Sequence, residues 1–238
     1  MTEFIQNFIK GRWEARAETP EELAARFLRM IDAFEAIVPI FRFWACNYRY
    51  PRNFETLRDS FAQEIAAKVA QDGSGNRYPQ LGYRFGAYTR DAPEGGSFII
   101  ECKAGATAEN AFPNDVTMAT FGRNPDPEII DYRLTRSALL AIVDAWEPVQ
   151  AAAFSNQLFM RSREAKYFRE AWIQYLCPWL AEKITPPSTV LVEHLPNGGL
   201  LMSATTETFD VDNPKHLGAA RDMAAAMAPL NALPWPSK

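Results

Sequence analysis

The chain has 238 residues, of which 47% are hydrophobic and 23% charged, and this composition excludes an intrinsically disordered protein. The length suits one α+β domain, or two small ones that share a core, and we expect a single domain over residues 1–238. The formal net charge is −4 and no run of lysine and arginine occurs, so we expect no nucleic acid partner, because phosphate contacts supply most of that affinity.

The first part of the chain predicts a strand and a helix. Residues 4–13 are rich in β-formers and read as the opening strand. Thr19, Pro20 and Glu22 form a capping box with proline at the first helical position. Apolar residues follow at helical spacing, so a helix is expected until Pro39.

A second helix and three strands are expected next. Asn53 should cap the helix, which ends at a glycine-rich turn, and Glu64 and Lys68 should pair on its solvent side. The strands are separated by turn-rich segments, which favours antiparallel pairing. They are expected at residues 82–90, 97–104 and 114–121.

The chain then predicts a helix over 134–146, ended by Glu147-Pro148, and a strand over 149–155. Four aromatic residues at helical spacing predict a further helix. Such an aromatic face is more often core than an exposed recognition surface. These residues are Phe168, Trp172, Tyr175 and Trp179.

The end of the chain predicts a hairpin and a closing helix. Strands are expected at 189–195 and 200–206 around the turn Asn197-Gly198-Gly199, and Asn213-Pro214 should begin the last helix. Because strands often follow strands directly, the expected fold is α+β, with a mostly antiparallel sheet packed by about four to five helices.

The sequence offers little catalytic chemistry. Its two histidines, His194 and His216, form no metal-binding or catalytic spacing. The cysteines, at positions 46, 102 and 177, lie in apolar contexts where an inert thiol is usual. We therefore expect no catalytic residue, no cofactor, no metal, no small-molecule substrate and no enzymatic activity. The N-terminus lacks the apolar stretch of a signal peptide, and no apolar run approaches membrane-spanning length, so we expect a cytoplasmic protein with no membrane partner.

One pattern keeps a metal-dependent nuclease open as the alternative. A strand ends in Glu101-Cys102-Lys103, and Asp91 lies upstream. Restriction-type nucleases use an Asp, a Glu and a Lys in this order to hold a divalent metal and orient a water. In a strand, Glu101 and Lys103 point to the same side. The simpler interpretation is a solvated face, because the basic surface that DNA binding requires is missing.

The segment before the last helix is acidic. Glu207, Asp210 and Asp212 cluster there, and they could hold a cation or meet a basic partner. The simpler interpretation is that Asp210 and Asp212 complement the positive end of the helix dipole.

Several short motifs follow one another in order along nearly the whole chain. They are Trp13, Glu18-Thr19-Pro20-Glu21-Glu22-Leu23-Ala24, Leu81-Gly82-Tyr83, Ala145-Trp146-Glu147-Pro148, Ala171-Trp172-Ile173-Gln174-Tyr175-Leu176, Gly198-Gly199-Leu200-Leu201-Met202 and Phe209-Asp210-Val211-Asp212-Asn213-Pro214-Lys215-His216. Taken together, they resemble the immunity protein 52 family of bacterial polymorphic toxin systems, and the order of the motifs is more specific than any one of them. Ala171 is a departure, because glycine is expected before Trp172.

This resemblance implies a cytoplasmic protein that neutralises a cognate toxin by stoichiometric blockade. Toxins paired with such proteins are similar to restriction-endonuclease-like nucleases, delivered by contact-dependent secretion such as type VI secretion. The recurring residues Trp146, Trp172 and Tyr175 would then serve the core or the hairpin. A nuclease site is basic, so an acidic surface suits it, and the candidate toxin-binding residues are Glu207, Asp210 and Asp212.

Overall fold

A computed structural model describes residues 5–37, 44–46, 52–89, 96–108, 112–121, 127–161 and 167–234. In this part of the chain, ten strands form one antiparallel sheet in the order β3-β2-β4-β5-β6-β1-β7-β8-β10-β9. Six α-helices accompany the sheet, which confirms the expected α+β class. None of the described helices combines the length and the apolar character that crossing a bilayer requires.

The strands and helices have the following bounds. The strands are β1 Asn7–Trp13, β2 Trp44–Cys46, β3 Arg52–Asn53, β4 Tyr83–Thr89, β5 Ser97–Ala104, β6 Asn114–Phe121, β7 Gln150–Ser155, β8 Ile173–Leu176, β9 Leu191–His194 and β10 Leu200–Ser203. The helices are α1 Pro20–Ile37, α2 Phe61–Ala66, α3 Tyr132–Trp146, α4 Asn156–Arg161, α5 Pro178–Ala181 and α6 Pro214–Met227, with 3-10 turns η2 Phe54–Ser60, η3 Pro79–Leu81, η4 Pro127–Ile130 and η5 Ala228–Ala232.

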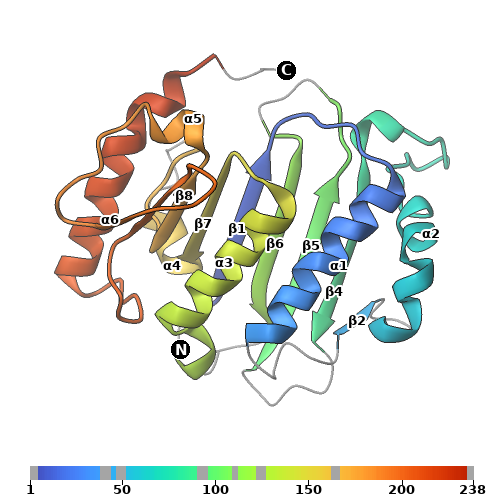
Figure 1. Cartoon of the computed structure of the whole chain (residues 1–238), viewed down its shortest axis with the longest axis horizontal. Helices are drawn as coiled ribbons and strands as arrows, with labels where there is room; N and C mark the ends of the chain where they lie inside the picture. The colour runs from blue at the N-terminus through green and yellow to red at the C-terminus, as the bar shows by residue number, and fades with distance from the viewer. Residues whose placement is uncertain are drawn as a thin grey trace.

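Helices α1 and α3 lie side by side over one face of the sheet, while α2 lies at the β4 end and α6 at the β8 end (Figure 1). The central strand β1 buries Ile9 and Trp13 on the helix-covered face. Gly11 lies between them, and a Cβ there would be 2.9 Å from Ile142 Cγ2 of α3. The missing side chain therefore lets α3 approach the sheet closely. We call the opposite side of the sheet its outer face.

The expected strands at 82–90, 97–104 and 114–121 are confirmed as β4, β5 and β6, although residue 90 lies outside the described part. Helix α1 begins as predicted. Glu22 Oε2 accepts from the Thr19 N–H at 2.8 Å, and Thr19 Oγ1 accepts from the Glu22 N–H at 3.3 Å. The expected end of this helix at Pro39 lies outside the described residues.

The prediction of one α-helix from Asn53 is wrong in part. Asn53 does cap, accepting from the Glu55 N–H at 3.0 Å, but the segment begins as the 3-10 turn η2 before it continues as α2. Hydroxyl groups explain the tighter turn, because Thr56 Oγ1 donates to Asn53 O at 2.7 Å and Ser60 Oγ to Leu57 O at 3.4 Å. The α-helical part ends at Ala66, before the expected glycine-rich turn.

The predicted helix with an aromatic face between residues 168 and 179 is wrong. Its centre is strand β8, and the four-residue helix α5 begins only at Pro178. All four residues of β8 are buried, because the strand lies between β7 and β10 with both faces covered. Such a strand shows no alternation of polar and apolar residues. The aromatic residues are therefore spaced as in a helix, although the centre of the segment is a strand.

The interpretation of these aromatic side chains as core is confirmed for Phe168, Trp172 and Tyr175, whereas the Trp179 side chain lies at the surface. Tyr175 also supports the β9–β10 hairpin, because its hydroxyl accepts from Asn197 Nδ2 at 3.1 Å. Trp146 is buried and stacks on Trp13 with ring centroids 5.2 Å apart. The family residues thus serve the core and the hairpin, as the resemblance implied.

Candidate functional site

The outer face of the sheet carries charged side chains in ordered rows. The strand register places Arg84 of β4 opposite Lys103 of β5, Lys103 opposite Asp115 of β6, and Asp115 opposite Arg12 of β1. The next row contains Glu101, which is exposed. Cross-strand neighbours interact directly, so this face is a patterned electrostatic surface on an otherwise mildly acidic protein.

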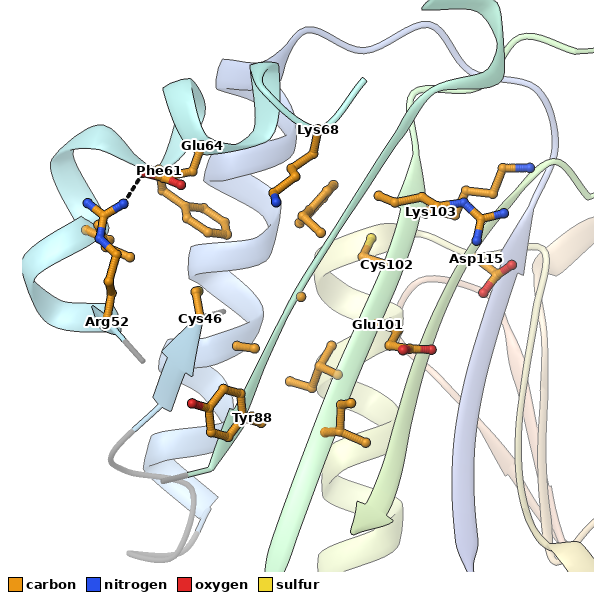
Figure 2. Close-up of a pocket in the computed structure, with 17 residues that line it drawn as sticks. Cys46, Arg52, Phe61, Glu64, Lys68, Tyr88, Glu101, Cys102, Lys103 and Asp115 are labelled. Carbon is orange, nitrogen blue, oxygen red and sulfur yellow. Dashed lines mark hydrogen bonds and ion pairs between the residues drawn. The ribbon is translucent and has the colours of Figure 1, made fainter. Parts of the chain in front are cut away.

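A groove of about 640 Å³ lies between this face and the segment that contains η2 and α2. Figure 2 shows Arg52, Glu64 and Lys68 on one side of it and Glu101 and Lys103 on the other. Apolar surface completes the lining. It comes in part from Phe61, Tyr88 and Ile99.

Two ion pairs occupy charged groups in or beside the groove. Arg52 binds Glu64 across the η2–α2 segment, so the expected pairing of Glu64 with Lys68 is wrong. Asp115 binds the Lys10 ammonium at 3.2 Å. Burial lowers the pKa of Lys10, and Asp115 opposes this shift by stabilising the charged form.

Three of the cations that line the groove have no such partner among the described residues. Lys68, Arg84 and Lys103 line the groove, and no hydrogen bond or ion pair joins the side chain of any of them to another described residue. Arg84 and Lys103 lie directly opposite each other, an arrangement of like charges that costs free energy. We call Lys68, Arg84 and Lys103 the cationic trio.

The residues of the alternative nuclease site are only partly placed. Glu101 and Lys103 share the outer face, as the alternation predicted, whereas Asp91 lies outside the described residues. Lys103 lies between Arg84 and Asp115. Within the described part of the chain, no group of three histidine, cysteine or acidic residues could hold a metal ion.

The acidic residues of the loop between β10 and α6 are brought together by a histidine. His216 Nε2 lies 3.3 Å from Glu207 Oε2, and His216 Nδ1 accepts from the Asp210 N–H at 3.2 Å. Asp212 pairs with Arg161 of α4 at 3.3 Å. The helix is capped by Asn213, whose Oδ1 accepts from the Lys215 N–H at 3.0 Å. The aspartates are therefore not the caps of α6.

This acidic loop is well exposed, since the Glu207 side chain is 78% accessible and that of Asp212 86%. It precedes α6, which lies at the other end of the sheet from α2 and the groove (Figure 1). The loop was found by its composition. The cationic trio was missed, because the sequence suggested an acidic partner for Lys68 and gave no register that would bring Arg84 to Lys103.

The chain is thus an α+β protein built on one broad antiparallel sheet, with α1 and α3 on one face and a charged groove on the other. It belongs to the immunity protein 52 family, whose profile matches residues 7–232. This match confirms the resemblance seen in the ordered motifs.

The fold is similar to the solved structure of Pseudomonas aeruginosa T6SS protein PA0821, with a TM-score of 0.50 and 9% sequence identity. The alignment covers 94% of this chain and 73% of the other. At this identity the likeness shows the fold alone. The sequence matches no curated protein.

Proposed function

We propose that this immunity protein neutralises a cognate toxin by binding it and covering its surface in a stoichiometric complex, without catalysing a reaction. The observation that carries the proposal is the family match over residues 7–232. The toxin of this proposal is a restriction-endonuclease-like nuclease delivered by a secretion system, and the protein meets it in the cytoplasm. The name of the structural neighbour, a T6SS protein, supports type VI secretion as the route.

Co-expression with the toxin gene next to its own gene tests this function. The protein should restore growth, co-purify with the toxin, and abolish the toxin's nuclease activity at a one-to-one molar ratio. Restored growth at a small fraction of the toxin concentration would point to catalysis. Absence of both protection and a complex would refute the proposal.

The nuclease alternative has a direct test of its own. The purified protein is incubated with DNA and Mg²⁺, and Glu101→Ala serves as the matched variant. We expect no cleavage by either protein. Cleavage that disappears in Glu101→Ala would instead support the nuclease alternative and assign a catalytic role to Glu101.

The acidic loop is part of the proposal as the surface that attracts a basic toxin. The variant Glu207→Lys, Asp210→Asn and Asp212→Lys reverses the charge of the loop, and it keeps a polar side chain where Asp210 Oδ1 accepts from the Asp212 N–H at 2.8 Å. Association should slow by about tenfold and lose part of its salt dependence, because steering acts on the on-rate. A control with equal charge change is Asp59→Lys, Glu182→Lys and Glu21→Gln at other exposed acids. Equal on-rates in the two variants would remove the loop from the interface.

A further inference from the structure

We infer that the groove between the η2–α2 segment and the outer face of β4 to β6 binds an acidic segment of the toxin, with the cationic trio holding its carboxylates. This inference rests on the proposed function and names the chemistry of the partner surface. It assigns a cationic site to a protein whose net charge is −4.

The first argument is that no side chain of the trio has an ion-pair partner among the described residues, since Asp115, which lies opposite Lys103, is bound to Lys10. Arg84 and Lys103 face each other across two paired strands, and Lys68 is tied to the same place because its carbonyl accepts from the Arg84 N–H at 3.1 Å. Like charges so placed repel each other in the free protein. A bound carboxylate removes this repulsion and gains charge-assisted hydrogen bonds, which arginine can make in pairs.

The second argument concerns which anion fits. The groove also contains Glu64, Glu101 and Asp115, and Asp115 lies in the same cross-strand row as Arg84 and Lys103. The phosphate backbone of a nucleic acid carries a negative charge at every nucleotide, so these carboxylates would repel it. A protein segment can instead place its acidic residues opposite the cations only. Tyr88, which is half-buried, adds aromatic surface of the kind that protein interfaces favour.

The third argument is the middle of β4, where the main chain has no described strand partner on the side of the groove. On the side of the groove, described strand or bridge pairing reaches only the two ends of this strand, through Val69↔Tyr83, Ala45↔Tyr88 and Trp44↔Thr89. Residues 85–87 between them line the groove without a described strand partner on that side. An extended segment would therefore meet main-chain groups as well as the cationic trio.

The decisive experiment measures the affinity of the full-length protein for the purified, catalytically inactive toxin by calorimetry. The variant Lys68→Glu, Arg84→Glu and Lys103→Glu should bind at least about tenfold more weakly than the wild type, because it removes all three carboxylate contacts. The control is Arg29→Glu, Arg133→Glu and Lys183→Glu, three exposed cations outside the groove and away from the acidic loop. Each exchange changes the charge by two, so both variants have a net charge of −10 instead of −4.

A single substitution separates binding from folding. Arg84→Glu replaces the repulsion of Lys103 with attraction, so the free protein should melt at the same or a higher temperature while it binds toxin more weakly. Weaker binding by a variant of undiminished stability assigns the loss to the groove.

The outcomes distinguish this inference from the function on which it rests. If the wild type binds toxin and the triple groove variant binds as tightly as its control, the inference is wrong and the proposed function stands. If the wild type neither binds nor protects, the proposed function fails first. If the wild type binds a DNA oligonucleotide and only the groove variant loses this binding, the groove is a nucleic acid site. The inference that it binds an acidic protein segment is then wrong.

Discussion

At the scale of single residues, one buried carboxylate joins α1 to the end of α3. Glu18 is 5% exposed at its side chain, and its Oε1 lies 3.1 Å from Arg16 Nε and 2.8 Å from Arg26 Nε. The two arginines also donate to the last carbonyls of α3, Trp146 O and Ala145 O. This cluster lies outside the groove and is a structural feature of the fold.

Glu18→Gln should lower the free energy of unfolding by about 2 kcal/mol, because it removes the buried counter-charge of Arg16 and Arg26 and leaves them only the exposed carboxylate of Glu147. The loss is smaller than for a fully buried pair, since both arginines are partly exposed. Urea denaturation measures it, with the exposed Glu182→Gln as the control. Equal stabilities of the two variants would show that the ion pairs contribute nothing.

The cysteines allow a second test at this scale. Burial raises the pKa of Cys46 to about 12 and that of Cys177 to about 11, and it raises the pKa of Cys102 well above its ordinary value. A raised thiol pKa means less thiolate at pH 8, and the thiolate is the reactive form. Iodoacetamide should therefore label the folded protein about a hundredfold more slowly than the unfolded chain, as read by mass spectrometry. Fast labelling of one cysteine would reveal a nucleophile that the fold does not suppress.

At the scale of elements, local chemistry predicted most boundaries. The capping box at Thr19, the cap at Asn213 and the alternation in β5 are signals within a few residues, and each element was found where expected. Strand β8 was not, because its burial on both faces comes from neighbours distant in sequence. The same limit applies to the groove. Alternation gave the direction of Glu101 and Lys103, but only the register of β4 on β5 brings Arg84 opposite Lys103.

The β9–β10 hairpin shows how an element depends on the buried strand beside it. A Cβ at Gly199 would lie 2.5 Å from Cε2 of Tyr175, whose ring is fixed in the core. Gly199→Ala should therefore destabilise the protein by about 2 kcal/mol through overpacking.

Gly218 of α6 is the matched control, because a Cβ at this position would have nothing within 4 Å of it. Gly218→Ala should stabilise the protein by about 0.5–1 kcal/mol, since alanine favours the helix. Thermal unfolding of the two variants should give shifts of opposite sign. Shifts of the same sign would contradict the close packing of the hairpin on Tyr175.

At the scale of the whole molecule, the sheet sets the separation of the two charged surfaces. The groove with the cationic trio lies over β4 to β6, and the acidic loop follows β10 near the other edge of the sheet. One cluster of buried side chains runs through the described chain from Ile9 to Leu230. Asn231 Oδ1 also accepts from the N–H groups of Tyr167 and Phe168, which ties the end of the chain to the segment before β8.

We propose on these grounds that residues 1–238 form one domain, and this predicts a single cooperative unfolding transition. Circular dichroism and tryptophan fluorescence should give coincident melting curves, because side chains that share one core unfold together. Arg84→Glu and Glu18→Gln should shift both curves together, although they alter different parts of the chain. Two separated transitions would instead mean that the groove and the acidic loop belong to two units that unfold independently. A toxin bound by both units would then have to fix their relative position, which costs binding free energy.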